Sequence, residues 1–110
     1  MPTIPPASSY LTLINVFSVN PARQQKLITL LKRATEEGVC KQPGFISAIL
    51  HKSIDGTRVA MYAQWRSRQD YENMRSNKEA APFLEEALTM ASFEPGMYEV
   101  VETFLPVARP

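Results

Sequence analysis

The chain has 110 residues, with 12 Lys or Arg against 11 Asp or Glu, and its formal net charge is +1. A chain of this length forms one ordinary domain and can bury its own hydrophobic core. The balanced charge gives no field that would attract a polyanion, so we do not expect nucleic acid as a partner. Cys40 is the single cysteine, which excludes an internal disulfide and favours a reducing, cytoplasmic setting.

Residues 1–9 (MPTIPPASS) contain three prolines, no apolar run and no basic leader. This pattern is not typical of a signal or transit peptide, and it predicts a flexible tail. No stretch approaches the roughly 18 consecutive apolar residues of a membrane span, so no membrane association is expected. We therefore expect a tail over 1–9, one domain over 10–105 and a short tail over 106–110.

Residues 10–19 (YLTLINVFSV) are rich in β-branched, aromatic and aliphatic types, which predicts a strand. Asn20 and Pro21 then provide an N-cap and a first helical residue. The helix that follows carries an apolar stripe with the i, i+3, i+4, i+7 spacing and ends near Gly38. The stripe consists of Leu27, Leu30, Leu31 and Ala34.

A hairpin is predicted in the middle of the chain. Residues 45–53 and 58–66 have strand character, and Asp55-Gly56 between them is a strong hairpin signal. Ser67, with Asp70 three residues later, resembles a capping box that opens a short helix through about residue 76.

The last third of the chain predicts one more helix and one more strand. Pro82 begins or kinks this helical piece, and Pro95-Gly96 ends it. Residues 97–105 (MYEVVETFL) alternate as a strand does, and Pro106 closes it. The apolar side of the helix consists of Phe83, Leu84, Ala87, Leu88 and Ala91.

The resulting order is strand, helix, strand, strand, broken helix, strand. This order predicts an α+β, ferredoxin-like split βαβ fold, with both helices on one face of a four-stranded antiparallel sheet. The opposite sheet face is then bare in a chain that is 45% hydrophobic, and such a face usually marks an interface. We therefore expect a homodimer through the sheet face, forming a dimeric α/β barrel.

Residues 51–71 read HKSIDGTRVAMYAQWRSRQDY, and residues 43–48 read PGFISA. Together these segments resemble the antibiotic biosynthesis monooxygenase family, with the nearest likeness to enzymes that oxidise anthrone rings to quinones. The resemblance implies oxidation of a small phenolic, quinol or anthrone-like compound by molecular oxygen, with no metal, haem or flavin cofactor. The protein would supply a dry pocket and a few polar groups.

The resemblance implies catalytic roles for Trp65, Tyr71 and His51. Trp65 can donate one hydrogen bond from its indole and pack against a flat aromatic ring. His51 is the group that titrates near neutral pH without perturbation. Asn15 is a fourth candidate, because an amide in an apolar central strand needs a partner, either internal or a ligand.

The predicted substrate-binding residues come from the third strand and the last helix. They are Tyr62, Met61, Gln64 and Phe83. Tyr62 and Gln64 share one face of their strand, whereas Met61, Ala63 and Trp65 share the other. Only one of these two sets can line the pocket, and the sequence leaves both choices open.

Two positions depart from the anthrone-oxidising pattern, which has an asparagine where this chain has Met61 and an arginine where it has Glu85. Both replacements remove a polar donor that would hold an anionic substrate. A ligand-binding dimer without catalysis is therefore an alternative, as are cofactor-free isomerase, cyclase and dehalogenase activities on the same fold. A haem-degrading relative is less favoured, because the predicted helices contain no histidine.

Overall fold

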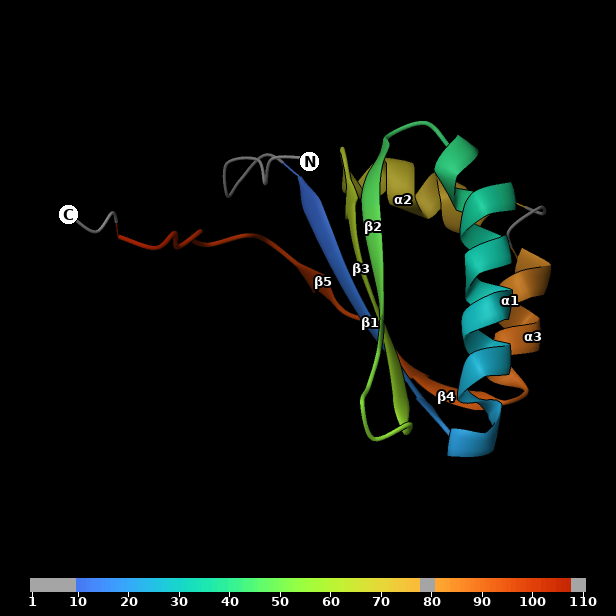
Figure 1. The fold of residues 1–110 in the computed structure, drawn as a ribbon. Helices are drawn as coiled ribbons and strands as arrows, with labels where there is room; N and C mark the ends of the chain where they lie inside the picture. The colour runs from blue at the N-terminus through green and yellow to red at the C-terminus, as the bar shows by residue number, and fades with distance from the viewer. Residues whose placement is uncertain (1–9, 78–80, 108–110) are drawn as a thin grey trace.

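The computed structural model describes residues 10–77 and 81–107. One antiparallel sheet carries helices on one side only (Figure 1). The strands are β1 (Leu11–Val19), β2 (Phe45–Lys52), β3 (Arg58–Trp65), β4 (Ala91–Glu94) and β5 (Met97–Tyr98). The helices are α1 (Gln24–Glu37), α2 (Arg68–Arg75) and α3 (Ala81–Leu88), with short 3₁₀ turns at Pro21–Arg23 and Val39–Lys41.

The strand order is β2-β3-β1-β4, and β5 also pairs with β1. The central pairing joins β1 to β3 in antiparallel register, from Leu11 opposite Trp65 to Ser18 opposite Arg58. This confirms the predicted ferredoxin-like α+β fold, as an open sheet in the single chain.

The register divides the sheet into two faces, because directly opposed residues point to the same side. We call the helix-covered side the inner face and the other side the outer face. The inner face carries Leu11, Leu13, Asn15, Phe17 and Val19 of β1 and Val59, Met61, Ala63 and Trp65 of β3. The outer face carries Thr12, Ile14, Val16 and Ser18 of β1 and Arg58, Ala60, Tyr62 and Gln64 of β3.

Two hydrophobic clusters fill the space between the inner face and the helices. The larger cluster joins the sheet to α1 and α3 through Phe17, Val19, Leu27, Leu30, Leu31, Val59 and Ala87. The second joins it to α2 through Leu13, Ala63, Trp65, Tyr71 and Met74. The predicted apolar stripe of α1 therefore faces the sheet, as expected from its spacing.

The predicted helix cap at Asn20 and the predicted hairpin turn at Asp55 both form in the structure. The Asn20 side-chain oxygen accepts a hydrogen bond from the Ala22 backbone N–H at 2.9 Å, which caps the first helical turn. In the hairpin turn Asp55 accepts hydrogen bonds from the Thr57 hydroxyl at 2.7 Å and backbone N–H at 3.0 Å. These bonds, the hydroxyl first, lower the pKa of Asp55 to about 2.

The C-terminal third corrects two predictions. Ala91 does not belong to the helical stripe: α3 ends at Leu88, and Ala91 begins β4. Pairing with β1 decides this, since Phe93 lies opposite Phe17 and the two rings stack at 4.8 Å. The predicted strand over 97–105 is also wrong in length, because only Met97 and Tyr98 pair with β1 in the single chain.

Residues 99–107 form no strand and project away from the body (Figure 1). The predicted tail over 1–9 and the last three residues of the predicted tail over 106–110 lie outside the described residues. Across the described ranges, no helix has the length and apolar character needed to cross a membrane.

Gly44 and Gly56 have nearly the same positive φ, +84° and +83°. A Cβ on Gly44 would overlap the Asp70 side chain, whereas one on Gly56 would lie 3.3 Å from Pro21. We expect Gly56→Ala to cost about 1–2 kcal/mol for the left-handed backbone alone. Gly44→Ala should cost a further 1–3 kcal/mol, because Asp70 must move.

Urea unfolding at one fixed protein concentration measures both losses. Equal losses of unfolding free energy in the two variants would show that the Asp70 side chain moves at no cost. Its position between α2 and the turn before β2 would then contribute nothing to stability.

Candidate functional site

The largest of the fully buried side chains, Trp65, lies at the end of β3 on the inner face. The Trp65 side chain is 1% exposed. Its ring meets Phe45 edge-on at 5.4 Å and Tyr71 at 6.0 Å between centroids. Tyr71 is 5% exposed, so the structure brings together the two aromatic residues that the family resemblance singles out.

The first turn of α2 sets the position of Tyr71. The Ser67 hydroxyl oxygen accepts a hydrogen bond from the Asp70 backbone N–H at 3.1 Å, which confirms the predicted cap. The Arg66 guanidinium donates two hydrogen bonds to the Asp70 carboxylate, at 2.9 and 3.1 Å. The Ser67 hydroxyl also donates to that carboxylate at 2.9 Å. The Arg66 bonds first, and then this Ser67 bond, lower the pKa of Asp70, and the bonds to Asp70 raise the pKa of Arg66.

Arg75 holds the other end of Tyr71, one helical turn further along α2. Its guanidinium donates to the Tyr71 hydroxyl oxygen at 2.8 Å and lies 5.9 Å from the ring centroid. Because Tyr71 accepts this bond, its own O–H remains available to donate to another oxygen. Sequence reasoning missed Arg75, although its i, i+4 spacing from Tyr71 was a usable signal.

Asn15 also lies on the inner face, opposite Met61. Its side-chain oxygen is buried, and no hydrogen-bond donor reaches it within the described structure. Met61 lies opposite Leu50 in the next strand. An unpaired buried carbonyl oxygen among apolar neighbours is costly, so its presence calls for an explanation.

Two adjoining cavities open between β2 and α1 and share Lys32 and Leu50. The outer one has a volume of about 410 Å³ and is lined by Gln25, Ile28, Lys32, Leu50, His51 and Lys52. The inner one, of about 110 Å³, is lined by Lys32, Thr35, Glu36, Ala48, Leu50 and Met61. The outer volume lies within the range of small-molecule pockets, and the pair leads from the sheet edge towards Met61.

The other predicted site residues are dispersed. His51 is exposed on the edge strand β2 and lines the outer cavity. Tyr62 and Gln64 lie on the outer face, away from Trp65. Phe83 packs against the larger core cluster, with Arg33 5.9 Å above its ring. Of the predicted residues of the third strand, Met61 and Trp65 therefore lie together on the inner face. Glu85, on α3, is exposed.

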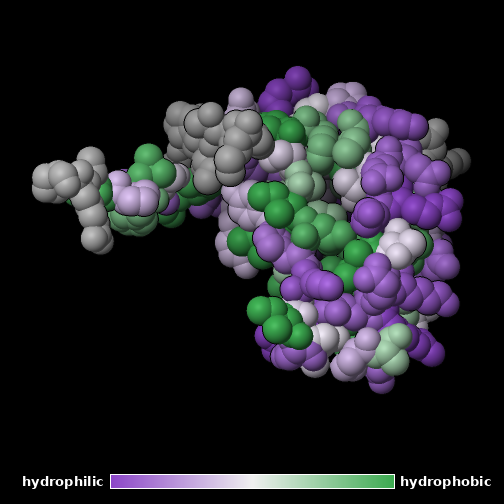
Figure 2. Space-filling view, viewed as in Figure 1, coloured by the Kyte–Doolittle hydropathy of each residue, from purple (hydrophilic) through white to green (hydrophobic). Residues whose placement is uncertain are grey.

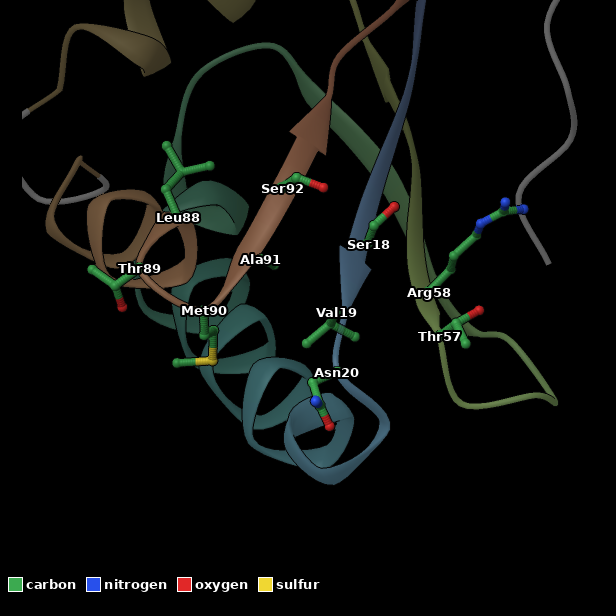
Figure 3. A pocket seen from close by; sticks show the side chains of 10 residues that line it. All are labelled: Ser18, Val19, Asn20, Thr57, Arg58, Leu88, Thr89, Met90, Ala91 and Ser92. Atoms are coloured by element: carbon green, nitrogen blue, oxygen red, sulfur yellow. The ribbon is translucent and has the colours of Figure 1, made fainter.

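A wider hollow, of about 820 Å³, lies elsewhere (Figure 3). Side chains from the end of β1, the start of β4, the end of α3 and the base of the hairpin surround it. It contains none of the predicted site residues, and Asn20 at its rim is already used as a helix cap. A metal site finds no support in residues 10–77 and 81–107, where no cluster of three His, Cys, Asp or Glu side chains could hold an ion.

Comparison with known proteins gives consistent matches. The sequence profile of the antibiotic biosynthesis monooxygenase family matches residues 10–86. A tetracenomycin-F1 monooxygenase from Streptomyces glaucescens is 38% identical over 104 residues, covering 94% of this chain and 93% of that protein.

Solved structures share the fold. The cofactor-independent oxygenase SnoaB from Streptomyces nogalater superposes with a TM-score of 0.71 at 18% identity, covering 91% of this chain and all of that one. A conserved protein from Methanosarcina mazei gives a TM-score of 0.76 at 15% identity, covering 84% and 93%.

Proposed function

Because this chain belongs to the antibiotic biosynthesis monooxygenase family, we propose that it oxidises a phenolic, quinol or anthrone-like aromatic compound with molecular oxygen and without a cofactor. The observation that carries the proposal is the 38% identity to a tetracenomycin-F1 monooxygenase along 94% of the chain. Such a substrate is rich in electrons and supplies them itself once it has lost a proton.

The reaction balances without a further reductant. For an anthrone, one ring carbon carries two hydrogens, and loss of a proton gives a delocalised anion. This anion transfers electrons to molecular oxygen, and a carbon–oxygen bond forms to give a hydroperoxide. Loss of water from the hydroperoxide leaves a carbonyl, so one oxygen atom enters the quinone and the other leaves as water.

Residues of the inner face support this chemistry. The burial of Trp65 and Tyr71 provides the low-dielectric surroundings in which a fixed donor best stabilises an anion. We propose that the Tyr71 hydroxyl donates to the substrate oxygen, and that the Asn15 carbonyl oxygen accepts a substrate O–H. His51 borders the outer cavity from the edge strand, opposite Ala60 of the outer-face set, and we propose it as the proton acceptor there.

Arg75 supplies the positive charge that the family resemblance gives to a residue of the last helix. Glu85 occupies that position here and is exposed, whereas the Arg75 guanidinium contacts the Tyr71 hydroxyl directly. We propose that Arg75 acts through Tyr71, because a charged donor polarises the hydroxyl and strengthens the bond that the hydroxyl donates onward.

A ligand-binding protein without catalysis is the second candidate. It is favoured by one observation, the apolar Met61 on the inner face, where the anthrone oxidisers have an amide. We further propose that the protein acts in the cytoplasm, where the exposed thiol of Cys40 would stay reduced, and that it forms a homodimer through the outer sheet face.

Oxygen uptake separates the two candidates. With a panel of hydroquinones and anthrones, we expect the protein to consume one molecule of oxygen per anthrone. Uptake should continue at an unchanged rate after exhaustive metal chelation, because the substrate supplies the electrons. An oxygen electrode measures both quantities. Saturable binding of these compounds with no oxygen consumed would instead establish the ligand-binding candidate.

Asn15 can be tested against a matched residue of the same strand. Asn15→Val removes the unpaired buried oxygen, so it should raise the free energy of unfolding by about 1 kcal/mol while lowering kcat/KM about tenfold or more. Thr12→Val is the control, because the Thr12 hydroxyl is also buried and unpaired within the described structure but lies on the outer face. It should stabilise similarly and leave turnover within twofold.

Urea unfolding measures the stability of the Asn15→Val and Thr12→Val variants, and steady-state kinetics measures their turnover. If Asn15→Val left turnover unchanged, Asn15 would have no role in the site. If it lowered both stability and turnover, the effect would be structural.

Arg75 can be tested against Arg68, which lies on the same helix and pairs with Glu72 at 2.9 Å. Arg75→Gln should lower kcat/KM about tenfold, equivalent to about 1.4 kcal/mol of transition-state stabilisation, and Arg75→Lys should recover part of the loss. Arg68→Gln should change it less than twofold.

Repeating the Arg75→Gln substitution in a Tyr71→Phe variant completes a double-mutant cycle between the two residues. There Arg75→Gln should have little further effect, because the hydroxyl through which Arg75 acts is gone. A full tenfold loss in that background would mean that Arg75 acts independently of Tyr71.

A further inference from the structure

The outer cavity between β2 and α1 carries charges that the proposed reaction does not use. Lys32 of α1 and Lys52 of β2 line it from opposite walls. Ile28 and Leu50 supply apolar surface in the same cavity, and no Asp or Glu of the described chain lines it. Figure 2 views the molecule from this edge and shows hydrophobic residues between β2 and α1, with hydrophilic residues along the helix beside them. Such a hollow fits a flat apolar body that carries a negative charge.

The strand register and the helix period explain why lysines and apolar residues meet in this cavity. Lys52 lies opposite Val59 of the inner-face set, and Leu50 comes two residues earlier, so both β2 side chains belong to the inner face. On α1, the residues that line the outer cavity recur every three or four positions and form one row beside the apolar stripe. Lys32 lines both cavities and therefore marks the place where they join.

Neither lysine is neutralised by a carboxylate of the described chain. On the same helix, Arg33 pairs with Glu37 at 3.0 Å. Lys32 and Glu36 have the same i, i+4 spacing, but within residues 10–77 and 81–107 they form no ion pair, and Lys52 forms none either. An ammonium group that lies beside apolar surface without a counter-charge attracts an anion that enters the cavity.

Glu36 indicates which of the two cavities takes the negative charge. Its carboxylate lines the inner cavity and opposes an anion there, whereas both lysines line the outer cavity. A substrate with one anionic substituent would therefore place that group in the outer cavity. The rest of its ring system would extend towards Met61, which lines the inner cavity and lies opposite Asn15.

We propose that Lys32 and Lys52 bind an anionic substituent, a carboxylate, of the aromatic substrate in the outer cavity and so orient its reacting ring towards the inner face. This inference rests on the oxidation proposed above and deepens it by naming a substrate class, an aromatic acid, and the two side chains that select it. Lys32 and Lys52 are then specificity-determining residues, which act through binding and not in the chemical step.

Binding of a stable quinone tests the role of the lysines separately from turnover. Anthraquinone-2-carboxylate is the anionic probe, and anthraquinone-2-carboxamide is its neutral counterpart. Exposed charge pairs are individually weak, so we expect the two lysines together to favour the acid about tenfold, equivalent to about 1.4 kcal/mol. The preference should largely disappear in about 1 M NaCl, where screening shortens the range of the charges.

The matched variants each remove one positive charge and keep an unbranched side chain. Lys32→Met and Lys52→Met should each reduce the preference for the acid to about threefold or less and leave the affinity for the carboxamide within about twofold. Lys26→Met is the control, because Lys26 is exposed on α1 and lines neither of the two cavities. It should leave the preference unchanged. Isothermal titration calorimetry measures all four proteins with both probes.

Oxygen uptake from the corresponding anthrone acid separates this inference from the proposed function. A preference for the acid that both lysine variants weaken, with no oxygen consumed, would keep the binding role and overturn the oxidation. Equal affinity of the parent for the two probes would overturn the inference, whatever the uptake. A preference that persists in both lysine variants, or at high salt, would also overturn it.

Discussion

The antiparallel pairing of β1 with β3 is the constraint on which the rest of the molecule depends. Eight opposed pairs run from Leu11–Trp65 to Ser18–Arg58, and each pair commits two side chains to the same face. A slip of one residue would exchange the faces and bring Tyr62 and Gln64 under the helices. The register therefore decides that Trp65, Met61 and Asn15 share the inner face, and that Ile14, Tyr62 and Gln64 lie on the outer face.

The two faces offer different physical surroundings. The helices exclude water from much of the inner face, so the hydrogen bonds that we propose for Tyr71 and Asn15 would form in a low dielectric, where each is strongest. None of the described helices covers the outer face, where Ile14 and Ile49 stay 37% and 52% exposed, and this exposure supports the association proposed above. The proposed chemistry on one side and the proposed association on the other are both compatible with a sheet that has helices on a single face.

Sequence reasoning succeeded where signals were local. The caps at Asn20 and Ser67 and the turn at Asp55 form as predicted, because each needs only a short polar side chain within three residues of an N–H. It failed at Ala91, which fits both a helical stripe and a strand, since contact with β1 makes the choice. It also missed Arg75, whose i, i+4 spacing from Tyr71 was a usable signal but whose hydrogen bond to the Tyr71 hydroxyl is seen in the structure.

The sequence by itself determined the order of most elements and which residues of each strand share a face, because a strand's period of two requires no knowledge of its neighbours. It could not determine which face the helices cover. β1 offers apolar side chains on both sides, Leu13 and Phe17 on one and Ile14 and Val16 on the other, and its pattern is nearly symmetric. Only the tertiary structure decided which face the helices cover, because the contact between Trp65 and Tyr71 requires α2 to lie on the inner side. As a result Asn15 and Met61 lie on the inner face, and Tyr62 and Gln64 lie on the outer face.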